Sequence, residues 1–181
     1  MSKIIDSGRI LEIFFDYPER DFHIREVSKL VKISPTTVSC YLDSMRKEGL
    51  LECKKERGYF LFRANADNMN FKEEKKHHNI IRLINSGILD FLNKELNYPS
   101  AIILFGSFSK GENIKGSDID LFVLSDCKKE LDLSHFEKKL GSSIQIFVYG
   151  RKDFESLKLN SKELLNSIIN GTVMSGFIEV F

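Results

Sequence analysis

Residues 102–124, IILFGSFSKGENIKGSDIDLFVL, decide the fold of the larger part of this chain. The apolar run 101–105 ends at Gly106-Ser107, a polar segment rich in glycine follows, and Asp118-Ile-Asp120 leads directly into a second apolar run. Short apolar runs with aromatic and β-branched residues, bounded by glycine, are typical of buried strands. The stretch therefore predicts a strand, a tight turn, a short helix or loop, and a second strand.

Asp118 and Asp120 are the first candidate functional residues. Residues two apart in a strand share a face, so we expect both carboxylates on one side and Ile119 in the core. Neighbouring carboxylates repel each other, and each prefers water unless a positive charge lies between them. Because Mg²⁺ takes carboxylate and phosphate oxygens as ligands, the pair predicts a site for Mg²⁺ or Mn²⁺.

The turn at Gly106-Ser107 predicts the complementary part of such a site. Glycine lets the backbone approach a ligand closely, serine offers a hydroxyl donor, and the N–H groups that open a following helix favour an anion. One end of the unit thus suits phosphate and the other suits metal, which together describe a site for a metal-bound nucleoside triphosphate (NTP). The alternative is an acidic turn with a purely structural role.

The motif LFGSFSKGENIKGSDIDLFVL closely resembles the signature of the DNA polymerase β-like nucleotidyltransferase superfamily, in particular its minimal nucleotidyltransferase branch. The resemblance spans about residues 70–181 and includes the tail SKELLNSIINGTVMSGF. It implies that Asp118 and Asp120 are catalytic and bind the metal. It also implies that four residues bind the nucleotide: Gly106, Ser107, Lys110 and Ser117. For Lys110 the alternative is a solvated side chain with no role in binding.

The sequence departs from this family at one position. Active members usually carry a third carboxylate on the strand after the two acids, and the matching position here is Gln145. Glutamine cannot accept a proton at neutral pH, and general-base help is worth roughly a hundred- to ten-thousand-fold. The preferred function is an Mg-dependent nucleotidyltransferase that moves a nucleoside monophosphate (NMP) from an NTP such as ATP to a hydroxyl of a protein or nucleic acid. The alternative is a transcriptional regulator whose nucleotidyltransferase-like domain binds nucleotide without turning it over.

Residues 67–97 are expected to supply a linker and packing helices before the first strand. Periodicity predicts helix over 71–96, broken at 85–87, and then a helix ending at 140, a strand at 143–149, and helices at 153–159 and 162–169. The apolar residues assigned to the buried side of the first of these helices are Ile80, Ile81, Leu83, Ile84, Ile88, Leu89 and Leu92.

The first third of the chain predicts three helices and a hairpin. The helices are expected at 4–15, 23–31 and 35–48, with Ser34 as the N-cap and Pro35 at the first position of the third helix. Two strands follow at 50–54 and 59–63, joined by residues 55–58. The residues expected to point inward are Ile4, Ile5, Ile10, Leu11, Phe14, Phe15, Ile24, Val27, Leu30, Val31, Val38, Leu42 and Met45.

The segment ISPTTVSCYLDSMRKEGLLE resembles the recognition-helix region of MarR-like and ArsR-like winged helix-turn-helix proteins, over about residues 7–65. The resemblance implies a third helix that enters the major groove of DNA and a wing that contacts phosphates. Its alternative is a protein-interaction module. The resemblance implies two groups of DNA-binding residues. The residues expected to be exposed on the third helix are Thr36, Thr37, Ser39, Cys40 and Tyr41, and the basic residues on the wing are Lys54, Lys55 and Arg57.

The expected fold class is therefore α+β with two domains. A winged helix-turn-helix domain at 1–66 precedes a nucleotidyltransferase-like mixed β-sheet with flanking helices at 67–181. The net charge of +1 does not by itself indicate a class of binding partner. The three widely spaced cysteines indicate neither a disulfide framework nor a zinc site. We expect a cytoplasmic protein that does not contact a membrane. Its expected partners are NTP and DNA, and two copies of the chain are expected to form a homodimer. A third hypothesis is an antitoxin-like enzyme that modifies a partner protein, such as a small helical toxin.

Overall fold

The computed structural model describes residues 2–179, with side chains described for residues 6–179. The chain divides between Lys75 and Lys76 into two compact units, and this point lies inside helix α4 (Met69–Ser86). Each unit contains helices and a β-sheet, so the expected α+β class is confirmed. The side chains of Ile4 and Ile5, which were expected to point inward, lie outside the described residues. Among the residues described, no helix combines the length and apolar character needed to cross a bilayer.

The first unit begins with three helices, α1 (Ser2–Asp16), α2 (Ile24–Val31) and α3 (Pro35–Lys47). The N-terminus of α3 is capped as predicted, because the backbone N–H of Thr37 donates to Ser34 Oγ at 3.2 Å. Val38, Leu42 and Met45 are buried, which confirms the predicted inner face of this helix.

A three-stranded antiparallel sheet completes the first unit, in the order β1 (Phe22–His23), β3 (Tyr59–Ala64), β2 (Leu51–Glu56). Strands β2 and β3 form a hairpin whose turn is only Arg57-Gly58, so the expected turn at 55–58 is wrong. The φ angles of these two residues are 49° and 86°. Two positive φ values are typical of a type I′ turn, which matches the twist of the strands and lets pairing continue to Glu56–Tyr59.

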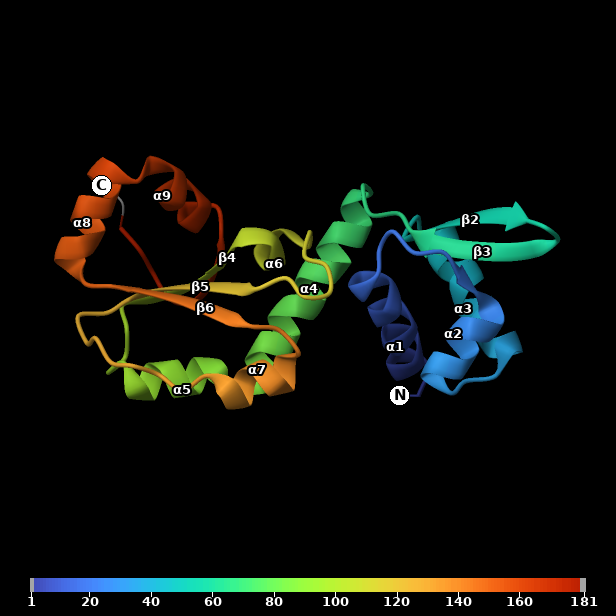
Figure 1. The fold of residues 1–181 in the computed structure, drawn as a ribbon, viewed down its shortest axis with the longest axis horizontal. Coiled ribbons are helices and arrows are strands. Elements are labelled where there is room, and N and C mark those ends of the chain that lie inside the picture. Colours follow the sequence, from blue (N-terminus) through green and yellow to red (C-terminus); the bar gives the residue numbers. More distant parts are fainter. Residues whose placement is uncertain (1, 180–181) are drawn as a thin grey trace. The chain divides into compact units, whose positions relative to one another are not determined.

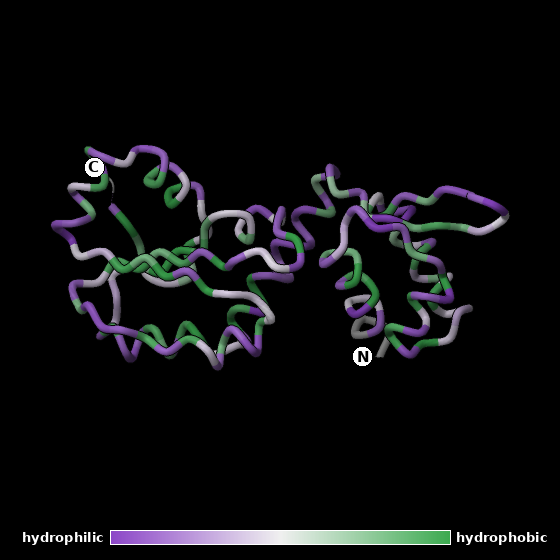
Figure 2. Tube along the Cα trace, viewed as in Figure 1, coloured by the Kyte–Doolittle hydropathy of each residue, from purple (hydrophilic) through white to green (hydrophobic). Residues whose placement is uncertain are grey.

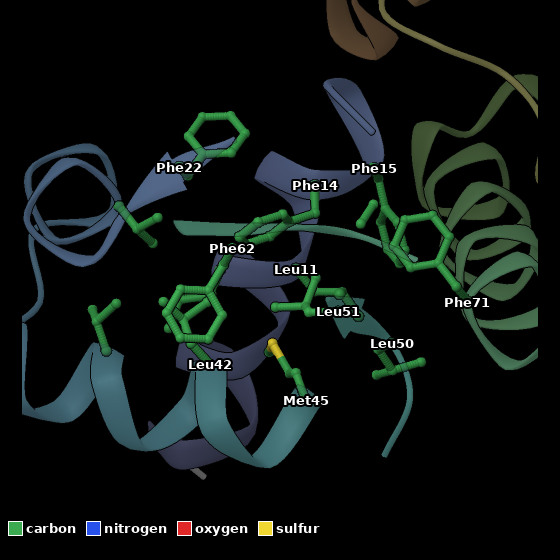
Figure 3. Packing of buried hydrophobic residues seen from close by; sticks show 14 of the residues in the cluster. Leu11, Phe14, Phe15, Phe22, Leu42, Met45, Leu50, Leu51, Phe62 and Phe71 are labelled. Carbon is green, nitrogen blue, oxygen red and sulfur yellow. The ribbon is translucent and has the colours of Figure 1, made fainter. Parts of the chain in front are cut away.

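The core of the first unit is rich in phenylalanine (Figure 3). The rings of Phe14 and Phe22 meet edge to face at 5.3 Å, and those of Phe15 and Phe71 at 5.2 Å. Leu30 was expected in this core, but it is 56 % exposed. The buried residues of α2 are instead Val27 and Val31, which lie four residues apart on one face of the helix.

Lys75 is a charged residue inside this otherwise apolar unit. Its side chain is 2 % exposed, and Nζ donates to the carbonyl oxygen of Phe15 at 2.7 Å. Burial, partly offset by the charge of Asp16, lowers the pKa of the Lys75 amine from its ordinary value of 10.5 to about 8. The folded unit therefore holds this proton less tightly than the unfolded chain does.

The variant Lys75→Met is expected to flatten the pH dependence of folding stability between pH 8 and 10.5. In the wild type, the unfolded chain binds more protons in this window, so the free energy of unfolding rises with pH; below it the full cost of the buried charge is present. Urea unfolding across the window measures the slope in both proteins. The matched control is Lys94→Met at an exposed position of helix α5 (Ile88–Glu95), which should keep the wild-type slope. A slope that persists in Lys75→Met would contradict the assignment to this amine.

The second unit is built on a four-stranded sheet with the order β6 (Ile144–Tyr149), β5 (Ile119–Leu124), β4 (Ala101–Phe105), β7 (Thr172–Gly176). Strands β5 and β6 are parallel, and the other neighbours are antiparallel. In this register Asp120 lies opposite Phe105 on one side and opposite Gln145 on the other. The predicted strand pair around Gly106 is therefore present, with its two acids at one end of the sheet.

Helices cover both faces of this sheet (Figure 1). One face packs against α5 (Ile88–Glu95), α7 (Ser134–Leu140) and the part of α4 after Lys76, and the other against α8 (Arg151–Asn160) and α9 (Lys162–Ile169). The central strands β4 and β5 are hydrophobic apart from Asp120, as expected for strands of a sheet buried on both faces (Figure 2).

The break between α4 and α5 falls at Gly87, as predicted, with a φ of 86°. The predicted buried side of α4 is wrong in part, because Ile81 and Ile84 are 56 % and 52 % exposed. Asn79 and Ser86 are buried there instead. Their polar groups are hydrogen-bonded inside the unit, which makes the burial of an amide and a hydroxyl tolerable.

Candidate active site

The two acids stand at the start of β5. Asp118 directly precedes the strand, Asp120 is its second residue, and both side chains are half-buried. Ile119 between them is 1 % exposed, and its backbone N–H donates to the carbonyl oxygen of Ser143 at 2.9 Å. The backbone that carries both carboxylates is thus held in place by the core and by the sheet.

Gly106 lies directly against the carboxylate of Asp120. A Cβ atom at position 106 would be 2.2 Å from Asp120 Oδ2, and the φ of Gly106 is 72°, a value that favours glycine. Desolvation by burial raises the pKa of the Asp120 carboxyl group, and the negative charge of Asp118 raises it further. A cation placed between the two carboxylates would relieve this repulsion.

Gln145 faces the same acids from the neighbouring strand. Its Nε2 atom donates to Asp118 Oδ2 at 2.7 Å. The position that the family resemblance assigned to a third carboxylate thus holds a neutral amide in contact with the pair. Within residues 2–179, no group of three or more histidine, cysteine, aspartate or glutamate side chains is placed to hold a metal ion.

The turn after β4 continues into the short helix α6 (Gly106–Lys110). Ser107 is half-buried at its start, and its carbonyl oxygen accepts from the N–H of Glu112 at 3.0 Å. Ser109 Oγ donates to the carbonyl oxygen of Gly106 at 2.9 Å, which holds the turn closed. Lys110 is exposed at the last position of the helix.

The loop between α6 and β5 has its own hydrogen bonds. Ser117 Oγ accepts from the backbone N–H of Ile114 at 2.9 Å, and the N–H of Ser117 donates to the carbonyl oxygen of Ile114 at 3.0 Å. Ser117 therefore stabilises the loop through its own hydrogen bonds. Its role in nucleotide binding stays a prediction.

Sequence reasoning missed the residues that anchor this loop to α4. Asn79 Nδ2 donates to the carbonyl oxygen of Phe108 at 3.0 Å and to Asn113 Oδ1 at 2.8 Å, and both asparagines are buried. A signal was present, because Asn79 precedes the buried Leu83 by four residues and so shares its helix face. A lone polar residue on a buried helix face indicates a specific hydrogen-bond partner.

The candidate nucleic-acid residues of α3 are only partly exposed as predicted. Thr36, Thr37 and Cys40 are exposed, whereas Ser39 and Tyr41 are half-buried, so the expectation of free exposure is wrong for these two. Tyr41 packs against the core of the first unit, since it lies three residues after the buried Val38 and flanks the inner face.

The three basic candidates of the hairpin differ in their surroundings. Lys54 forms an ion pair with Asp21 at 2.7 Å, and Glu56 lies 3.8 Å from the same amine, so its charge is largely compensated. Lys55 lies over the ring of Phe60, with Nζ 5.8 Å from the ring centroid. Arg57 is exposed in the turn.

Residues 86–170 match the family model described as a nucleotidyltransferase domain. The match begins at the end of α4, runs through β4, β5 and β6, and ends after α9, so it includes Gly106, both acids and Gln145. The predicted resemblance to a nucleotidyltransferase domain is confirmed over this range, and nucleotidyl transfer in general is supported. The match does not reach the helices and hairpin of the first unit. A comparison with curated proteins found no match for the chain.

Proposed function

We propose that the second unit transfers an NMP group from an Mg²⁺-bound NTP to a hydroxyl group of a protein or nucleic acid. The observation that carries this proposal is the arrangement of Asp118 and Asp120 on one face beside the glycine turn at Gly106. This arrangement joins an acidic end to a glycine turn in which the missing side chain makes room for the Asp120 carboxylate. The family match over residues 86–170 supports the same reaction class.

Asp118 and Asp120 are the residues that would hold Mg²⁺ or Mn²⁺. They fit a hard divalent cation, because both ligands are carboxylates, and burial together with the charge of Asp118 raises the pKa of Asp120. When bound, the cation would neutralise charge on the triphosphate and on the reacting phosphoryl group. No third acidic side chain is needed for binding when the triphosphate itself supplies ligands.

The turn and loop would position the triphosphate. The Gly106 backbone can approach a phosphate closely, Ser107 offers a hydroxyl, and the exposed amine of Lys110 offers a positive charge. Ser117 holds the loop next to Asp118 through its hydrogen bonds to Ile114. The chain thus contributes mostly orientation and charge, which is what transfer of a phosphoryl-type group requires.

The first unit is proposed to be a winged helix that contacts nucleic acid. Thr36, Thr37 and Cys40 on α3 would face bases, with Ser39 and Tyr41 at the edges of that face. The hairpin residues Lys54, Lys55 and Arg57 would lie near phosphates. Pairing of two copies on adjacent half-sites would raise the affinity of a small binding module. Protein interaction by this unit, with a modified partner or a toxin, is the competing reading.

One observation favours a second function, namely a regulator that binds NTP without efficient turnover. Gln145 occupies the position opposite Asp120 and donates to Asp118. An amide cannot remove a proton from the attacking hydroxyl, so this position supplies no general base. In that case NTP binding would alter DNA binding instead of leading to transfer.

The test is transfer of label from each of the four α-labelled NTPs, with Mg²⁺ or Mn²⁺, to the protein itself, to RNA and to cell extract. The control is the double variant Asp118→Asn/Asp120→Asn, in which the side-chain volume is kept and both charges are lost. Equilibrium binding of Mg-NTP is measured on the same samples.

Label that appears with the wild type and is absent with the double variant supports the enzyme and identifies its acceptor. Mg-NTP binding without label on any acceptor supports the regulator, and a change in DNA affinity on adding NTP then becomes its expected consequence. Failure to bind Mg-NTP at all would contradict both functions.

A further inference from the structure

A groove of about 850 Å³ opens in the first unit between the start of α2 and the end of the β2–β3 hairpin. It exists because β1 is short. Strand β1 pairs with β3 only at Phe22–Phe62 and His23–Leu61, and the chain then turns into α2. On the edge of β3 that faces away from β2, no strand of the described chain therefore continues beside Tyr59 and Phe60, although β3 extends to them and pairs there with β2.

Two large aromatic side chains line this groove without belonging to the core. Tyr59 is 65 % exposed and Phe60 is 54 % exposed, and neither is part of the hydrophobic cluster of the unit. His23 lies beside Tyr59, with ring centroids 5.6 Å apart and planes at 87°. Exposed aromatic faces of this kind lose contact with water when a flat apolar group stacks on them.

The groove also carries uncompensated positive charge. Arg25, Lys29 and Arg57 line it, and among the described side chains none of the three takes part in an ion pair or hydrogen bond. Of the two acids in the lining, Glu26 forms an ion pair with Arg20, and Glu56 lies 3.8 Å from Lys54, whose closer partner is Asp21. The remaining charge complements an anionic ligand.

We propose that this groove binds a single-stranded segment of nucleic acid. An unstacked base would lie against Tyr59 or Phe60, and its phosphates would lie near Arg25, Lys29 and Arg57. A duplex keeps its bases stacked and offers no free base face to these rings. An acidic peptide would satisfy the cations but would leave the aromatic faces unused. The inference rests on the nucleic-acid role proposed for the first unit and adds a preference for single strands and a location at the hairpin, next to Pro35 at the start of α3.

The test is fluorescence anisotropy of the full chain with labelled single-stranded RNA, single-stranded DNA of the same sequence, and the matching DNA duplex, without NTP. The variant Tyr59→Ser/Phe60→Ser removes both rings. The matched control is Tyr98→Ser, which removes an 81 % exposed aromatic ring from the second unit. Circular dichroism of each variant reports folding, and the conservative variant Tyr59→Phe/Phe60→Tyr keeps both stacking surfaces.

The double serine variant is expected to lose about 5- to 150-fold in affinity for single strands, the range for loss of one stacked base, while the Tyr98 and conservative variants keep wild-type affinity. Comparison of the affinities for single-stranded RNA and single-stranded DNA shows which nucleic acid the groove prefers. Single-strand affinity unchanged in the double serine variant would overturn the proposal. So would a duplex that binds as tightly as the single strands and loses affinity equally in that variant.

The result of this binding test can be distinguished from the results that test NMP transfer and duplex binding. Binding is measured without NTP, so a protein that shows no NMP transfer can still support or overturn the groove. Duplex binding that depends on Thr36 and Cys40 while single strands fail to bind would support the winged helix and overturn the groove alone.

Discussion

Replacing Asp120 by asparagine is expected to lower NMP transfer by about 100- to 1,000-fold, the usual cost of removing one preorganised electrostatic contact to a reacting group. The same change is expected to stabilise the protein in the absence of metal. Asp120 is partly buried beside Asp118, and both features raise the pKa of its carboxyl group, so its charge opposes folding. Functional residues that carry such strain commonly give more stable variants when replaced.

The sign of the pH effect follows from the raised pKa. The folded carboxyl group takes up its proton at a higher pH than the unfolded one, so the cost of the charge is complete above the folded pKa. It vanishes below the unfolded value, about 3.9. The difference in stability between Asp120→Asn and the wild type should therefore be largest at neutral pH and should disappear on acidification.

The measurement combines single-turnover transfer with thermal unfolding, each with and without Mg-NTP. Added Mg-NTP should raise the midpoint of the wild type and have little effect on the variant, because ligand stabilises only the state that binds it. The control is Asp153→Asn, since Lys128 lowers the pKa of Asp153 through a 2.7 Å hydrogen bond. That variant should keep transfer and lose a little stability. An Asp120→Asn protein that is less stable than the wild type at neutral pH would contradict the described repulsion.

Replacing Gln145 by glutamate is expected to raise the rate of transfer by about 100- to 10,000-fold if proton removal limits the reaction. Position 145 lies opposite Asp120 in the parallel register, and its side chain already contacts Asp118 Oδ2. A carboxylate there could accept a proton from the attacking hydroxyl and add a third oxygen ligand for the cation. The metal-free variant should be less stable, because it exchanges a hydrogen bond to Asp118 for a third negative charge.

Gln145→Met is the matched control, because it removes the amide donor without adding charge. It should show no gain in transfer. The affinity for Mn²⁺, measured by electron paramagnetic resonance, should rise in Gln145→Glu and exceed that of Gln145→Met. Unchanged transfer together with unchanged Mn²⁺ affinity in the glutamate variant would rule out a site at which position 145 faces the cation.

Local rules account for the parts of the fold that were predicted correctly. The strands around Gly106, the helix break at Gly87 and the Ser34 cap each depend on residues close together in the chain. Glycine at a positive φ and a serine hydroxyl at a helix start act through their own backbone neighbours. The facing of Asp118 and Asp120 likewise follows from the period of a strand.

The errors about which helical side chains are buried occur where burial depends on a packing partner that is distant in the sequence. Leu30, Ile81 and Ile84 are apolar residues of amphipathic helices, yet they are exposed. Sequence periodicity identifies an apolar stripe, but the element that packs against the helix sets how wide the buried stripe is. Asn79 is buried in the same helix as Ile81 because the carbonyl oxygen of Phe108 and the side chain of Asn113 accept its protons.

By itself, then, the sequence determined that two carboxylates share one face at the start of a buried strand and that a glycine turn precedes them. Strand period and glycine conformation are properties of a few neighbouring residues. Only the tertiary structure decided that Gln145 touches Asp118, that Asp120 lies against Gly106, and that β1 stops early enough to leave Tyr59 and Phe60 paired with β2 alone. These contacts join residues far apart in the chain, and their geometry depends on strand register and on the packing of the whole unit.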